Sequence, residues 1–212
     1  MKKKKINTYL YTRYERFWHW VQMVLIFILL LTGFEIHNEY HLFGFGKAVN
    51  IHSWVGLGWL IAFFFFIFWL LTTGEWKQYI PTTKKILEVM WYYVHGIFKG
   101  ETHPVPKKKH AKHNPLQRII YLVLAALLLP VQMLTGFLYW GYNNWADWGI
   151  DFLSLGVMAF LHVAGAFAIL SFVIIHVYMT TTGHSLFAHI KAMISGWEEL
   201  EEAEVEEWER AN

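Results

Sequence analysis

The stretch Leu153–Met179, LSLGVMAFLHVAGAFAILSFVIIHVYM, is long, apolar and free of Asp, Glu, Lys and Arg. A helix needs about 20 apolar residues to cross the hydrocarbon core of a bilayer. A single open strand is excluded there, because its backbone amides would find no hydrogen-bond partner in lipid. The stretch therefore predicts a membrane-spanning helix, and this helix carries two histidines, His162 and His176.

Three further stretches have the same character, namely Phe17–Ile36, Ser53–Thr72 and Ile119–Trp140. Hydrophobic residues make up 56% of the 212 residues and charged residues 16%, whereas a soluble domain has about 45–50% and about 25%. The predicted fold class is therefore all-α, an integral membrane four-helix bundle. Pro130 lies inside the third stretch and predicts a kink, which membrane helices tolerate.

The lysines and arginines gather on one side of the predicted membrane. Six precede the first span, nine lie between the second and third, two follow the fourth, and only Lys47 lies in the two opposite loops. By the positive-inside rule, the N and C termini and the loop of residues 74–117 face the cytoplasm. The predicted location is a multi-pass position in an inner (cytoplasmic) membrane of the bacterial type.

The cytoplasmic loop and the C-terminal tail each have a recognisable pattern. Between Ile86 and Ile97 apolar residues recur at helical spacing, which predicts an interfacial amphipathic helix between the second and third spans. From Glu198 to Glu209 the chain carries eight glutamates, and we expect a solvated helical end there, with partner docking as the alternative. The predicted domains are residues 1–182, which include the loop, and an acidic cytoplasmic tail of residues 183–212.

The absence of cysteine limits the chemistry of the chain. It excludes disulfides, cysteine-ligated zinc, iron–sulfur clusters and covalent haem of the C-x-x-C-H type. Histidine, by contrast, occurs 12 times. Any metal or redox centre in this chain must therefore use histidine, methionine or carboxylate ligands.

A weak internal repeat relates the two halves of the chain. The tetrapeptide LTGF occurs at residues 31–34 and again at residues 134–137, and His52 and His162 follow in the next span of each half. The repeat indicates two related helical hairpins, of spans one and two and of spans three and four.

Four histidines lie within the spans or at their ends, although ionisable groups in a membrane are costly and by default mark function. The direction of each span places His19 and His176 at the inner level, and His52 and His162 at the outer level. His162 and His176 are 14 residues apart, which is about 21 Å along one helix face. The depths allow only the pairs His19–His176 and His52–His162. Two facing imidazoles on neighbouring helices are the axial ligands of a b-type haem.

Two other roles for these histidines remain open at this stage. A histidine in a span also forms helix–helix hydrogen bonds, and zinc is the other candidate metal, although two isolated pairs fall short of its usual four ligands. Haem also needs small residues beside the macrocycle and cations near its propionates. The candidate small residues are Gly33, Gly56, Gly136 and Gly165, which helix packing would also explain. The candidate propionate partners are Arg13 and Arg16, which the positive-inside rule would also explain.

Three features resemble a known family, the dihaem cytochrome b membrane subunits of respiratory formate dehydrogenase, nickel–iron hydrogenase and thiosulfate reductase. They are the segment RYERFWHW at residues 13–20, the two histidines of the fourth span, and the loop end KHNPLQR at residues 112–118. The resemblance implies two haem b groups held by the four histidines. It also implies a quinone site at the cytoplasmic haem, near Asn114 and His176, although Asn114-Pro115 is also a regular helix start. His103, His110 and His113 are expected to be solvated.

The resemblance implies a membrane subunit that transfers electrons between quinone or quinol on the cytoplasmic side and a periplasmic-side redox partner. Without cysteine the chain has no iron–sulfur or c-type haem relay of its own, so the partner would be an iron–sulfur or multihaem cytochrome subunit. Nucleic acid is not expected to bind. Any catalysis would belong to another subunit of that complex. The sequence is compatible with electron flow from the partner to quinone and with flow from quinol to the partner. A free-standing cytochrome b561 oxidising superoxide or a similar small molecule is the first alternative, and a histidine-lined transporter without haem is the second.

Overall fold

The computed structural model describes residues 5–101, 103–105, 112–182 and 186–201. It contains four helices that are long and apolar enough to cross a membrane, as the sequence predicts. The first, second and fourth are α1 (Arg13–Ile36), α2 (Phe45–Thr73) and α6 (Leu155–Thr180). The third consists of α4 (Pro115–Val123), a π-helical turn (Leu124–Leu128) and α5 (Leu129–Trp140). The predicted helical membrane fold is confirmed.

The π-helical turn in the third span lies directly before Pro130. Proline has no backbone N–H and its ring crowds the carbonyl group four residues earlier, so a regular α-helical hydrogen bond is lost there. Widening of the preceding turn is a common response of a helix to such an interruption. The irregularity that the sequence predicts at Pro130 therefore takes the form of a π turn.

Two of the spans begin with side-chain caps. The Asn114 side chain accepts a hydrogen bond from the Gln117 backbone N–H, while the Gln117 side chain accepts one from the Asn114 backbone N–H. At the start of α1, Thr12 and Glu15 make the same reciprocal pair. Each capping box satisfies two backbone donors that the first helical turn leaves without a partner.

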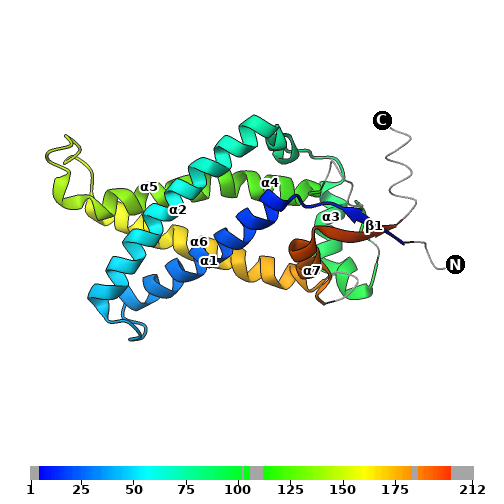
Figure 1. Ribbon diagram of the computed structural model, residues 1–212, viewed down its shortest axis with the longest axis horizontal. Coiled ribbons are helices and arrows are strands. Elements are labelled where there is room, and N and C mark those ends of the chain that lie inside the picture. The colour runs from blue at the N-terminus through cyan, green and yellow to red at the C-terminus, as the bar shows by residue number, and fades with distance from the viewer. Residues whose placement is uncertain (1–4, 102, 106–111, 183–185, 202–212) are drawn as a thin grey trace. The chain divides into compact units, whose positions relative to one another are not determined.

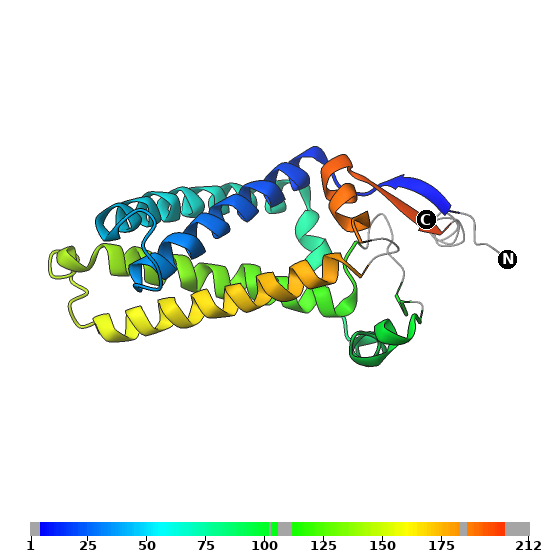
Figure 2. The same ribbon diagram turned by 90° about the horizontal axis from the view of Figure 1, so that it is seen from below.

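The chain divides into two compact units, which we describe separately. The helical unit comprises residues 18–72 and 125–175, and the terminal unit comprises the described residues of 1–17, 73–124 and 176–212. Within the helical unit, α1 and α2 form one hairpin and α5 and α6 form the other (Figures 1 and 2). This is the pair of hairpins that the repeat predicts.

A buried carboxylate closes the α1–α2 hairpin. The side chain of Glu35 is 2% exposed, and its Oε1 accepts hydrogen bonds from the backbone N–H groups of Leu42, Phe43 and Gly44. These donors precede and open α2, where the N-terminal end of the helix dipole favours a negative charge. Glu35 thus fixes the turn that sets the position of α2 beside α1.

The terminal unit contains a two-stranded antiparallel ribbon that no sequence pattern predicts. Strand β1 (Lys5–Tyr9) pairs with β2 (Trp197–Glu201), and the helix α7 (Ala188–Ser195) immediately precedes β2. Leu200 is buried, whereas Tyr9 and Trp197 meet edge to face on the ribbon. The first glutamates of the tail are therefore in a strand and not in a solvated helix; Glu202–Glu209 lie outside the described residues.

The loop between the second and third spans is helical where its periodicity predicts a helix. It contains α3 (Ile86–Trp91), a π-helical turn (Tyr92–Gly96) and two 3₁₀ turns (Glu75–Tyr79 and Ile97–Lys99). Val89 is fully buried within the terminal unit, while an exposed apolar stripe follows the other side. The stripe consists of Leu87, Met90, Trp91, Val94 and Phe98. Its position at a membrane surface stays a prediction.

Candidate functional site

The helical unit brings together two of the histidines that the sequence pairs. His52 comes from α2 and His162 from α6, and their ring centroids are 6.1 Å apart with the ring planes at 76°. A metal ion bonded to one nitrogen of each ring from opposite sides, at about 2 Å per bond, requires a centroid separation of roughly 6 Å. The side chains therefore lie at the spacing of two axial ligands on one metal ion.

A threonine of the neighbouring helix fixes the proton on His52. Thr32 Oγ1 lies 2.9 Å from His52 Nδ1. The Thr32 hydroxyl donates its own hydrogen to the carbonyl groups of Ile28 and Leu29 in α1, so its oxygen accepts the Nδ1–H of the histidine. This arrangement leaves the Nε2 lone pair as the ligand atom, which is how partners of a metal-binding histidine set its tautomer.

The second hairpin repeats this arrangement around His162. Thr135 Oγ1 lies 3.3 Å from His162 Nδ1, and the Gln132 carbonyl oxygen lies 3.2 Å from the same atom. The Thr135 hydroxyl donates to the carbonyl groups of Val131 and Gln132. Thr32 and Thr135 are the threonines of the two LTGF segments, so the repeat marks the residues that orient the two imidazoles. The repeat is visible in the sequence, but this role of the threonines is not.

The glycines of the same segments lie against the histidine rings. A Cβ atom built on Gly33 would be 3.5 Å from His52 Cε1, an ordinary contact, whereas one built on Gly136 would be 2.9 Å from His162 Cε1. Real Cβ atoms are essentially never found that close to another atom. Gly136 is therefore required for the observed position of His162, while Gly33 only permits a close approach to His52.

The residues at this site fit a haem group. Both imidazoles have an acceptor on Nδ1 and leave Nε2 for the metal. Within α6 the buried residues are Gly165 and Ile169. Within the described residues, no group of three or more His, Asp or Glu could hold a metal ion, so these histidines lack the additional protein ligands that a zinc site requires. Two imidazoles and glycines beside them suit a flat macrocycle that supplies its own four equatorial nitrogens.

The inner pair of histidines is divided between the two units. His19 lies in α1 within the helical unit and is half-buried, with the Trp20 ring edge-on at 5.3 Å. His176 lies in α6 within the terminal unit and is also half-buried. The pairing of His19 with His176 therefore remains a prediction.

The two candidate propionate partners have different surroundings. Arg13 is exposed at the first position of α1. Arg16 is half-buried, and one of its guanidinium nitrogens donates to the carbonyl oxygen of Ile194 at the end of α7. Arg16 Nε is buried without a hydrogen-bond partner. Arg16 is therefore the better placed of the two to receive an additional anionic group.

Asn114 lies at the centre of a polar cluster in the terminal unit. Besides capping α4, it donates from Nδ2 to the Tyr93 hydroxyl at 2.8 Å and lies 3.4 Å from His103 Nε2. Asn114 itself is 7% exposed. Burial raises the pKa of Tyr93, although the hydrogen bond from Asn114 opposes this shift. The helix-cap interpretation of Asn114-Pro115 is confirmed, and the amide also bonds to a neutral tyrosine.

The loop histidines differ from the solvated residues that the sequence predicts. His103 is half-buried against the rings of Tyr92 and Tyr93. His113 is half-buried between Tyr79 and Tyr121, with centroid distances of 5.5 and 4.9 Å. The expectation is wrong for these two, because aromatic side chains far apart in the sequence converge on them, and His110 lies outside the described residues.

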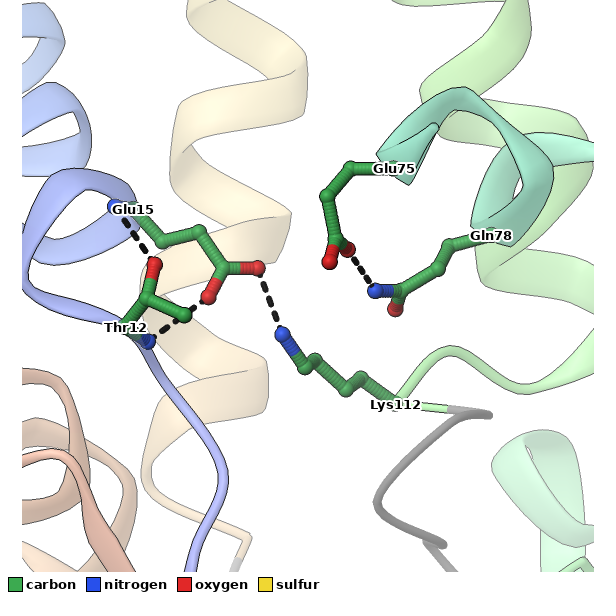
Figure 3. Close-up of polar contacts among 5 residues, drawn as sticks. All are labelled: Thr12, Glu15, Glu75, Gln78 and Lys112. Carbon is green, nitrogen blue, oxygen red and sulfur yellow. Dashed lines mark hydrogen bonds and ion pairs between the residues drawn. The ribbon is translucent and has the colours of Figure 1, made fainter. Parts of the chain in front are cut away.

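An ion pair joins the end of this loop to the start of α1 (Figure 3). Lys112 Nζ lies 2.6 Å from Glu15 Oε1, and the two side chains are 7% and 18% exposed. The other carboxylate oxygen of Glu15 accepts the Thr12 backbone N–H. Nearby, the Gln78 side chain donates to Glu75 (Figure 3). Glu15 thus caps α1 and forms an ion pair with Lys112, two residues before Asn114. The T-x-x-E spacing at residues 12–15 predicts the cap. No pattern in the sequence predicts the ion pair.

We expect Lys112→Met to destabilise the terminal unit by about 2 kcal/mol. Removing one partner of a buried ion pair leaves an uncompensated charge, which costs 3–5 kcal/mol in a fully buried pair and less here because Glu15 retains some exposure. Thermal unfolding of the detergent-solubilised chain measures the effect. Lys191→Met, on α7, is the matched control, and equal melting temperatures for both variants would contradict the proposed contribution of the ion pair.

The chain is similar to a family of known cytochromes. The family model described as prokaryotic cytochrome b561 matches residues 10–196. The chain is 29% identical to a putative cytochrome YdhU of Escherichia coli over 89% of this chain and 74% of the relative. It is 27% identical to a probable Ni/Fe-hydrogenase B-type cytochrome subunit of Rhodobacter capsulatus over 96% of this chain and 86% of the relative.

A third relative is the cytochrome b556 subunit of formate dehydrogenase from Haemophilus influenzae, 23% identical over 84% of this chain and 71% of the relative. The family match covers all four spans and both residues of the His52–His162 pair. The family implies haem b, and four apolar helices imply a multi-pass protein of the bacterial inner membrane. The chain belongs to the prokaryotic cytochrome b561 family.

Proposed function

We propose that the chain transfers electrons through the membrane between quinone and a redox partner, using two haem b groups. The observation that carries the proposal is the His52–His162 pair at 6.1 Å, with a threonine on each Nδ1 and a glycine against each ring. When bound, haem would supply a one-electron redox centre. The residues of this chain contribute the axial nitrogens, their fixed tautomers and an apolar surrounding.

The second haem in this proposal uses His19 and His176. Both side chains are half-buried in apolar helices, and His176 lies 14 residues after His162 on the same helix face, about 21 Å away. Arg16 would bind a propionate near the start of α1. Two centres at two depths would let electrons cross most of the bilayer within one chain.

The orientation in this proposal follows from the positive charges. Residues 1–16, 74–118 and 181–212 carry 17 of the 18 lysines and arginines, which favours the cytoplasmic side for these segments. The His52–His162 pair then lies towards the periplasm and His19 and His176 towards the cytoplasm. A partner that exchanges electrons with the outer pair would bind at the periplasmic side.

The quinone site in this proposal lies at the cytoplasmic side, beside Asn114. Reduction of a quinone to quinol takes two electrons and two protons, so its carbonyl oxygens need nearby hydrogen-bond donors. The cluster of Tyr93, His103 and Asn114 offers such groups within hydrogen-bonding distance of one another. Uptake of the protons from the cytoplasm would couple electron transfer to a membrane potential.

Asn114→Ser tests the quinone role without removing the helix cap. Serine caps a helix about as well as asparagine but lacks the amide that donates to Tyr93. We expect an unchanged haem content and about a tenfold slower reoxidation of reduced haem by a water-soluble quinone, the loss that one hydrogen bond to a polar ligand gives. Stopped-flow spectroscopy measures the rate. A wild-type rate would show that Asn114 serves only as a cap.

Purification identifies the partner. Hydrogenase and formate dehydrogenase cytochrome subunits are among the relatives, so we propose that this chain also assembles with a catalytic complex through an iron–sulfur or multihaem subunit. Mild detergent extraction followed by mass spectrometry of the copurifying proteins tests this. A chain that purifies alone and oxidises superoxide in the presence of quinone would instead establish the free-standing cytochrome b561 activity.

A further inference from the structure

The two hairpins differ at one position beside the outer histidines. Three residues before the threonine of each LTGF segment stand Leu29 in α1 and Gln132 in α5. Their backbone carbonyl groups are equivalent, since each accepts a hydrogen bond from the threonine hydroxyl of its own helix. Their side chains differ, since one is apolar and the other is an amide. The surroundings of His52 and His162 are therefore unequal.

The Gln132 side chain contacts only one member of the pair. Its Nε2 lies 3.2 Å from His162 Nδ1 and 3.4 Å from His162 Nε2. Because Nδ1 carries its own hydrogen and Nε2 is left for the metal, this contact is an electrostatic one between the amide dipole and the ring and not a hydrogen bond. Its Oε1 is buried without a hydrogen-bond partner, and a Cβ on Gly165 would lie 2.2 Å from that oxygen. Gly165 thus provides the space that the amide occupies. At 7% exposure, this dipole is shielded from water, where its electrostatic effect is largest.

We propose that Gln132 raises the reduction potential of the outer haem by directing the positive end of its amide dipole towards His162. This inference rests on the proposed haem ligation by His52 and His162. Reduction adds one negative charge to the centre, and an N–H group directed at an axial ligand favours that added charge. Hydrogen bonds and dipoles near an axial ligand are established means by which proteins set haem potentials. Gln132 is a positioning and tuning residue, because it acts on the metal through His162.

Gln132→Met removes the dipole and keeps a side chain of similar length. In a potentiometric titration of the full chain followed in the visible haem band, we expect the outer haem to titrate at a lower potential. At a fixed ambient potential its ratio of reduced to oxidised haem should fall about fivefold, because the buried dipole that favours the reduced form is lost. The outer haem is identified as the component that is absent from His162→Ala.

Gln22→Met is the matched control. Gln22 is also a glutamine of the helical unit with one buried amide atom lacking a hydrogen-bond partner, but it accepts a hydrogen bond from Trp59 at 2.6 Å and contacts neither outer histidine. We expect Gln22→Met to leave the outer component where it is in the wild type. An equal shift in both variants, or no shift in Gln132→Met, would overturn the inference.

Leu29→Gln keeps Gln132 and adds an amide at the matching position beside His52, so it tests the inference even if Gln132→Met loses the outer haem. We expect the outer component to move to a higher potential, opposite to the shift in Gln132→Met. An unchanged potential in Leu29→Gln would contradict the proposed effect of an amide at this position. Absence of any haem band in the wild type would instead overturn the proposed function, so the two failures are distinguishable.

Discussion

His162→Ala is expected to lose half of the haem b of the purified chain. The imidazole of His162 is one of the two candidate axial ligands that lie 6.1 Å apart, and a b-type haem is held chiefly through its axial bonds and the surrounding packing. The ligands predicted for the inner haem, His19 and His176, are unchanged, so that haem should remain. Haem per chain, determined as the pyridine haemochrome against protein concentration, measures the loss.

The variants His52→Ala and His52→Ala/His162→Ala sharpen this test. If the two histidines hold the same haem, each single variant and the double variant lose one haem only, because residues that act as one unit are not additive. His41→Ala is the matched control, since His41 is an exposed histidine of the loop after α1. Loss of neither haem in the single variants, or loss of two different haems, would contradict the pairing.

Gly136→Ala is expected to lose most of the same haem. A methyl group at this position would lie 2.9 Å from His162 Cε1, so the ring must leave the place that Thr135 and Gln132 define for it. Alanine is otherwise favoured over glycine in a helix by about 1 kcal/mol. Any loss therefore comes from the contact with the histidine and not from a weaker helix.

Two other glycine variants separate this contact from a general effect. Gly33→Ala makes an ordinary contact of 3.5 Å with His52 Cε1, and Gly58→Ala in α2 meets no atom within 4 Å. We expect both to keep their full haem content in the reduced-minus-oxidised spectrum. The interpretation of Gly136 fails if Gly136→Ala binds as much haem as Gly58→Ala.

Much of the membrane fold follows from the sequence, because lipid leaves few alternatives. A long apolar run without charges has to form a helix in a bilayer, and all four predicted runs lie within or nearly within the observed spans. The direction of the spans then orders the histidines by depth. The structure places His52 beside His162, the outer pair that this ordering predicts.

The terminal unit was less predictable, because its contacts join residues far apart in the chain. Strands β1 and β2 pair residues 5–9 with residues 197–201, and no local pattern in either segment requires that partner. The Glu15–Lys112 ion pair likewise spans 97 positions. His103 and His113 were expected to be solvated, since a basic loop gives no sign of the tyrosines that pack against them.

The residues around the outer histidines were only partly predictable. The LTGF repeat is visible in the sequence, and the need of a haem for small neighbours makes Gly33 and Gly136 candidates, but the hydrogen bonds from the imidazoles to Thr32 and Thr135 require the helices to be placed. The role of Gln132 cannot be predicted from the sequence, because a single glutamine in an apolar helix is compatible with many packing roles. Its contact with His162 is a property of the assembled hairpin.

Haem quantitation on the wild-type chain tests whether the four-helix chain binds two haem b groups. The chain is purified from the membrane, reduced with dithionite, and its absorption is compared with the oxidised form and with its pyridine haemochrome. We expect the bands of b-type haem and two haem groups per polypeptide. A preparation of folded, full-length chain without such bands, or with a single haem that His162→Ala leaves in place, would contradict it.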